Sequence, residues 1–233
     1  AEGSSELVPL NLAALVAMVF LGFLLARPFS VEGIFLTGGW LASQGWLPYH
    51  DFFDSHAPGL FFLLGKIYSI FGATLEGTRL LVLLMNVATI LAVYVTARKM
   101  FDERTAILAV ALHSVWLPVF YGFRAVTEPF TTFFSTLAVM ALHHVVVGKR
   151  HEPRDLLLLG IALGLNVVFK QATLVFVAAM IGVAVIYLIA YRQTQHLWSM
   201  KSAAAVAGFG VLPLLAAAPY VLSGSLPELL NQT

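Results

Sequence analysis

The chain has 233 residues, of which 60% are hydrophobic and only 11% are charged. Soluble domains have about half apolar and about a quarter charged residues, so this composition excludes an ordinary soluble protein. The formal net charge of +1 gives no basic surface for a nucleic-acid partner, and the absence of Cys excludes disulfides and thiolate metal sites. We therefore expect an integral membrane protein surrounded by the lipid bilayer.

Several segments are long and apolar enough to cross a membrane as helices. In chain order they are residues 8–26, 78–97, 105–123, 128–147, 155–170, 172–191 and 203–222. No basic region of the kind found in signal peptides precedes the first apolar run, so we interpret it as a retained helix. The sequence predicts an all-α fold, a polytopic transmembrane helical bundle of about seven spans.

Residues 27–77, between the first two predicted spans, are more than a simple loop. They contain two apolar segments, 32–45 and 59–72, and the second includes Lys66. Segments this short usually lie at the membrane interface instead of crossing it. We expect an interfacial loop with short helices, within one domain over residues 1–233 and with no soluble C-terminal domain.

The distribution of basic residues predicts the orientation of the helices. The loops after the second, fourth and sixth predicted spans hold most of the Lys and Arg residues, so we expect them and the N-terminus to be cytoplasmic. Residues 27–77 and the turns at 123–129 and 168–172 then lie together on the extracytoplasmic side. Ionisable side chains near the membrane are costly and usually mark a functional site, although a single one at a helix end can simply extend to water.

The acidic residues on that side suit catalysis of a group transfer from a phosphate-linked donor to a hydroxyl. Such a transfer needs a base that removes the proton of the acceptor hydroxyl, and a carboxylate can supply it. The candidate catalytic residues are Glu32, Asp51 and Asp54.

Phosphate binding and metal binding are further possible roles for this group of residues. Arg and Lys bind phosphate, and the candidates for this role are Arg79, Arg124 and Lys170. Carboxylates and imidazoles ligate divalent cations, and the candidate metal ligands are Asp54, His56 and Glu128. A divalent metal ion is therefore a candidate cofactor.

The order of the motifs resembles a known family. "EGIFLTGGWLASQGWLPYHDFFDSHAPGLFFLLGKIYSIFG", "YGFRAVTEPFTTFF" and "GLNVVFKQATLVF" resemble the amino-terminal half of membrane glycosyltransferases of the GT-C fold. The similarity is to the bacterial and archaeal branch related to protein O-mannosyltransferases and to the aminoarabinose transferase that modifies lipid A. It runs from about residue 10 to about residue 222, which is nearly the whole chain.

The resemblance implies a polyprenyl- or dolichyl-phosphate sugar donor, an extracytoplasmic active site and often a divalent metal, in the cytoplasmic membrane of a bacterium or archaeon. By position, Glu32 corresponds to the second acid of the family's Asp-Glu pair. Asp54 and His56 fall in its proline-bearing loop motif, Glu128 on its later acidic position and Lys170 on its basic turn.

Two departures from the family pattern keep other functions open. The family's leading Asp is replaced by Val31, which cannot transfer a proton, and family members typically extend well beyond this length. The alternative is a non-catalytic subunit that docks into a larger membrane complex through its apolar faces and through small-residue surfaces such as 202–210, which allow close approach of helices. A third possibility is a haem- or pigment-bearing subunit that uses His113 or His143.

Overall fold

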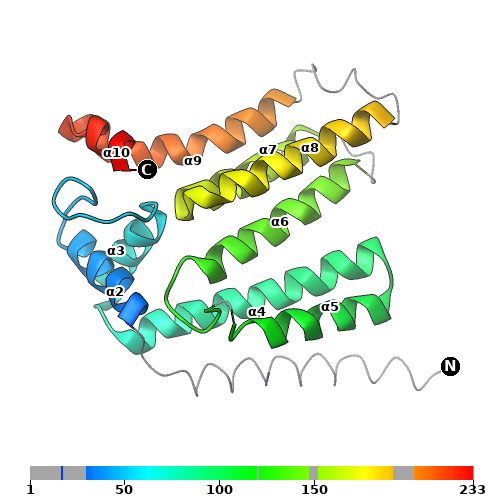
Figure 1. Ribbon diagram of the computed structural model, residues 1–233, viewed down its shortest axis with the longest axis horizontal. Coiled ribbons are helices and arrows are strands. Elements are labelled where there is room, and N and C mark those ends of the chain that lie inside the picture. The colour runs from blue at the N-terminus through cyan, green and yellow to red at the C-terminus, as the bar shows by residue number, and fades with distance from the viewer. Residues whose placement is uncertain (1–16, 18–29, 120, 147–151, 191–201, 233) are drawn as a thin grey trace.

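The computed structural model describes residues 17, 30–119, 121–146, 152–190 and 202–232, and this part of the chain contains helices and no strand (Figure 1). In chain order the elements are α2 (Ser30–Ser43), α3 (Gly59–Phe71), α4 (Leu75–Met100), α5 (Glu103–Trp116), α6 (Glu128–Val146), α7 (Pro153–Phe169), η1 (Gln171–Thr173), α8 (Leu174–Ala190), α9 (Ser202–Ser223) and α10 (Leu226–Gln232). The helical class predicted from the sequence is confirmed.

Six of the predicted spans correspond to helices α4 to α9, and the first, at 8–26, lies outside the described residues except for residue 17. By length and composition α4, α6 and residues Ala203–Ser223 of α9 can each cross a membrane, while Gly59–Phe71 and Gln171–Tyr187 are shorter apolar helices. These helices form a membrane bundle.

Helix α5 is shorter than the sequence predicts. The predicted span reached residue 123, but α5 has 14 residues and ends at Trp116. Pro118 follows the C-terminal cap Leu117 directly, and a proline there cannot continue the helix. At about 1.5 Å per residue α5 is roughly 21 Å long, less than the roughly 30 Å hydrocarbon core.

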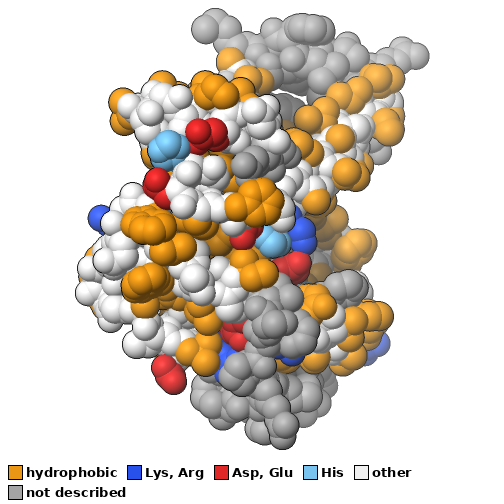
Figure 2. Space-filling view, turned by 60° about the vertical axis from the view of Figure 1, so that its left-hand side comes forward, with side chains coloured by type: hydrophobic (Ala, Val, Ile, Leu, Met, Phe, Trp, Pro, Cys, Tyr) orange, Lys and Arg blue, Asp and Glu red, His pale blue; other side chains and the backbone are white. Residues whose placement is uncertain are grey.

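One end of the bundle brings together α2, α3, α10, the N-termini of α4, α6 and α8, and the C-termini of α7 and α9 (Figure 1). We call it the site end. The short helices predicted within 27–77 are confirmed as α2 and α3 at this end, joined by residues 44–58, and their place at the membrane interface remains a prediction. On the face shown in Figure 2, many hydrophobic side chains are exposed, and a few acidic, basic and histidine side chains lie among them. That the site end is extracytoplasmic remains a prediction.

Small residues let helices approach closely in two places. A Cβ atom at Gly39 would lie 2.6 Å from Cβ of Leu64, which is where α2 packs on α3. A Cβ at Gly208 in α9 would lie 2.5 Å from the carbonyl oxygen of Leu157 in α7, and one at Gly160 would lie 2.1 Å from that of Ala205. Gly208 of the small-residue surface at 202–210 therefore packs within the chain, whereas a Cβ at Gly210 would meet nothing within 4 Å, and docking of a partner at this surface stays a prediction.

Candidate functional site

Asp54 and His56 form a side-chain pair in the loop between α2 and α3. Oδ1 of Asp54 accepts a hydrogen bond from the backbone N–H of His56 at 2.8 Å and lies 2.6 Å from Nδ1 of its ring. The Asp54 side chain is 10% exposed and the His56 side chain 37% exposed. The carboxylate therefore fixes the orientation of the imidazole, while part of the ring stays accessible.

Tyr49 fixes the loop from its other side. Its hydroxyl donates a hydrogen bond to the carbonyl oxygen of His56, and its ring is buried near that of Tyr220, with centroids 6.0 Å apart. Burial, helped by the negative charge of Asp54, raises the pKa of Tyr49, so its hydroxyl stays a donor. The backbone of Tyr49 has φ of 67°, a left-handed conformation that a large side chain adopts only where contacts hold it.

Gln171 connects this loop to the turn between α7 and α8. Its Oε1 accepts from the backbone N–H of Ala57 at 3.1 Å, and its Nε2 donates to the carbonyl oxygen of Ser55 at 2.9 Å. One amide side chain thus satisfies backbone groups on both sides of His56. In the sequence, only the polar turn at 170–171 indicated that Gln171 could hold this loop.

Lys170 and Glu128 form an ion pair beside that turn. Nζ of Lys170 donates to Oε1 of Glu128 at 2.7 Å, with the two side chains 37% and 31% exposed. Glu128 is the first residue of α6, where a negative charge favours the helix dipole, and Thr127 donates to its Oε2 at 3.3 Å. The predicted sites at Glu128 and Lys170 are thus one contact between α6 and α7.

Glu32 has a different environment from the other acids. It is buried in the first turn of α2, and Nη2 of Arg79 donates to its Oε2 at 3.1 Å. Its Oε1 accepts from Nε of Arg79 at 3.3 Å and from the backbone N–H of Ala125 at 3.1 Å. Both carboxylate oxygens are therefore occupied by groups that hold α2, α4 and the 117–127 loop together.

Two predicted residues remain, Asp51 and the half-buried Arg124. Asp51 is exposed, and its Oδ2 accepts from the backbone N–H of Leu47 at 2.6 Å. The guanidinium of Arg124 lies 5.9 Å from the ring centroid of Tyr121, in the loop whose Ala125 binds Glu32.

A comparison with protein families shows where the chain belongs. The family described as dolichyl-phosphate-mannose-protein mannosyltransferase matches residues 55–222. The chain belongs to this mannosyltransferase family. No curated protein and no solved structure matches the chain. The GT-C resemblance of the sequence is confirmed, and the chain is a mannosyltransferase-like membrane protein.

The part that matches the mannosyltransferase family includes most of the site. It begins at Ser55 and so contains His56, Lys170 and Gln171, whereas Asp54 directly precedes it. Glu32 also lies outside it.

The described part of the chain contains no ready-made set of metal ligands. No group of three His, Asp or Glu side chains there is arranged to hold a metal ion. Glu128 is paired with Lys170, and Asp54 with His56, so the predicted metal ligands belong to two separate contacts. We therefore derive no chemical step that uses a metal.

Proposed function

We propose that the chain transfers a sugar from a polyprenyl-phosphate donor to an acceptor hydroxyl at the site end, with Asp54 and His56 as its acid–base pair. The observation that carries this proposal is the contact of 2.6 Å between the carboxylate and a partly exposed imidazole, in a loop fixed by Tyr49 and Gln171. A carboxylate that orients an imidazole is a recurring arrangement for proton transfer.

The reaction balances with these groups alone. The acceptor oxygen forms a bond to the anomeric carbon of the sugar, and its proton passes to the imidazole of His56. The bond between the anomeric carbon and the phosphate oxygen breaks, and its electron pair stays on the polyprenyl phosphate. Asp54 stabilises the imidazolium that forms, because it is a buried carboxylate hydrogen-bonded to the ring.

Binding of the phosphate falls to Arg124 and Lys170 in this proposal. Arg79 is less suited, because it binds the buried Glu32. Lys170 is partly exposed, and its residue neighbour Gln171 holds the loop of His56. A phosphate there would compete with Glu128 for the ammonium group.

Transfer by purified protein in lipid nanodiscs tests the proposal, with dolichyl-phosphate-mannose as donor and a hydroxyl-bearing peptide or lipid as acceptor. Asp54→Asn and His56→Gln should each reduce transfer at least about a hundredfold, since loss of general base catalysis costs 10²–10⁴-fold. Glu76→Gln, an exposed acid in the first turn of α4, is the matched control and should retain wild-type transfer. Full transfer by both site variants would exclude this acid–base assignment.

A second candidate, a non-catalytic subunit of a larger membrane complex, is favoured by the environment of Glu32. The family's leading Asp is Val31 here, and its second acid is fully engaged by Arg79 and Ala125. In that case the wild type would bind the donor lipid without transferring sugar, and it would purify from its own membrane with partner subunits.

A further inference from the structure

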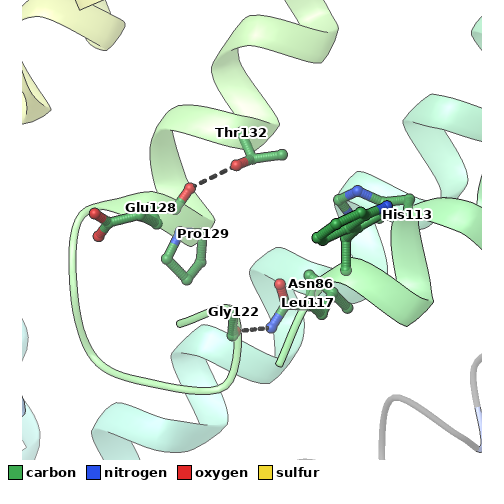
Figure 3. A pocket seen from close by; sticks show the side chains of 8 residues that line it. Asn86, His113, Leu117, Gly122, Glu128, Pro129 and Thr132 are labelled. Atoms are coloured by element: carbon green, nitrogen blue, oxygen red, sulfur yellow. Dashed lines mark hydrogen bonds between the residues drawn. The ribbon is translucent and has the colours of Figure 1, made fainter. Parts of the chain in front are cut away.

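A cavity of about 280 Å³ lies between α4, α5 and α6, next to the site described above (Figure 3). Asn86 of α4 and His113 and Trp116 of α5 line it, together with Leu117 and Pro129. Ligand pockets for drug-sized molecules have roughly 300–1,000 Å³, so this cavity suits a ligand of about one ring.

Two polar groups of the cavity can bind a ligand. The side chain of Asn86 is 1% exposed, and its Nδ2 donates to the carbonyl oxygen of Gly122 at 2.5 Å. In Figure 3 its amide oxygen points away from Gly122, toward the space between Pro129 and His113. Nε2 of His113 is buried and has no hydrogen-bond partner among the described residues. Buried polar atoms usually have partners, so the cavity is suited to a ligand that supplies them.

The residues that line the cavity favour a neutral group over an anionic one. None of the described residues that line it is Lys or Arg. Glu128 contributes to the wall, but its carboxylate points away from His113 in Figure 3 and binds Lys170. A phosphate would find no cation there, whereas a neutral molecule with hydroxyl groups could bond to Asn86 and His113.

We infer that this cavity binds the sugar ring of the donor and selects among sugars by their hydroxyl groups. The inference rests on the proposed function. A sugar ring has hydroxyls at its edge, which suit Asn86 and His113, and an apolar C–H face, which suits Trp116, Leu117 and Pro129.

Contacts between residues connect the cavity to the acid–base pair. Glu128 lies in the cavity wall and binds Lys170, and the next residue, Gln171, holds the backbone on both sides of His56. Glu128 thus joins the wall of the cavity to the residues that we propose for phosphate binding and proton transfer.

Binding of two lipids to protein in nanodiscs tests the inference: dolichyl-phosphate-mannose and dolichyl phosphate, which lacks the sugar. Wild-type protein should bind the mannose-bearing lipid more tightly. Asn86→Leu and His113→Phe should each weaken that binding about tenfold, the effect of losing one or two hydrogen bonds, and change binding of dolichyl phosphate less than about twofold. His143→Phe, on α6, is the matched control and should keep wild-type binding.

A milder variant, His113→Gln, keeps a polar side chain and serves if His113→Phe does not fold. Unchanged preference for the mannose-bearing lipid in folded Asn86→Leu and His113 variants would overturn the cavity assignment, and transfer measured on the same wild-type sample would show whether the proposed function still holds. A wild type that binds neither lipid would overturn both.

Discussion

Glu32 and Arg79 form an ion pair between α2 and α4, with Nη2 of Arg79 3.1 Å from Oε2 of Glu32. The pair is nearly inaccessible, since the two side chains are 1% and 14% exposed. Glu32, which the sequence indicates as a catalytic candidate, is therefore also a structural contact. A structural role and a catalytic role lead to different predictions for its replacement.

Replacement of Glu32 by Gln should destabilise the protein. The change removes the negative charge that pairs with the largely buried Arg79 guanidinium, and breaking one partner of a buried pair costs about 3–5 kcal/mol. Thermal unfolding in detergent, monitored by size-exclusion chromatography, measures the loss of stability. Glu76→Gln is the control, because surface substitutions are usually within about 0.5 kcal/mol. A Glu32→Gln protein with unchanged stability would contradict the structural role.

Gln171→Ala should loosen the loop that carries Asp54 and His56. The variant loses two hydrogen bonds to the backbone at Ser55 and Ala57, each worth about 0.5–1.5 kcal/mol. Hydrogen exchange of residues 54–58 should become faster, and sugar transfer should fall while binding of dolichyl phosphate persists. Unchanged exchange in Gln171→Ala would show that the amide does not hold the loop.

The contact between His50 and α10 should depend on pH. Nδ1 of His50 lies 2.7 Å from Oε2 of Glu228, and this hydrogen bond and the charge of Glu228 raise the pKa of His50, with a smaller contribution from Asp51. Because the folded pKa is raised, the stabilisation is complete below the ordinary pKa of about 6.5 and is lost as pH rises through the raised value.

Spin labels can measure the loss of the contact between His50 and α10. Labels are attached to introduced Cys residues, and the chain has no Cys of its own that would react. Phe53→Cys and Leu230→Cys place labels at exposed positions on the loop and on α10. The distance between the labels should lengthen or broaden as the pH rises. The same pair of labels in a Glu228→Gln background should show no pH dependence in this range, and a persisting dependence there would assign the change to another group.

Gly208→Ala should separate α7 from α9. The added methyl group would lie 2.5 Å from the carbonyl oxygen of Leu157, and overpacking of this kind costs about 1–3 kcal/mol. Gly210→Ala is the matched control in the same helix, because a Cβ there meets nothing within 4 Å. Thermal unfolding should therefore separate the two variants, and equal stability would show that the helices can move apart at little cost.

Much of the fold could be predicted from the sequence. The length of each apolar segment identifies the spans, and because successive spans cross in opposite directions, their order decides which residues reach the same end of the bundle. Asp54, His56, Glu128 and Lys170 were assigned to one end in this way, and the structure places them there. The short α5 was missed because the apolar run continues beyond Pro118, so that hydrophobicity did not indicate the end of the helix.

The pairings within the site could not be predicted, because they join distant residues. The sequence supplies Glu32 and Arg79 as separate charges, and only the packing of α2 on its neighbours makes them partners. Gln171 was missed for another reason: a neutral amide carries no charge that would distinguish it from an ordinary polar turn. The cavity at Asn86 and His113 needs three helices to form and has no sequence motif of its own.

The contacts of the loop at residues 48–57 have a consequence for the order in which the protein is made. The loop lies early in the chain, but Gln171, Tyr220 and Glu228, which hold it, are synthesised much later. Chains fold from the N-terminus during synthesis, at about 5–20 residues per second. The contacts of this loop with Tyr220 and Glu228 can therefore form only after α9 and α10 have been synthesised, so that a ribosome-bound chain contains the proposed acid–base residues long before it has all the contacts that hold their loop.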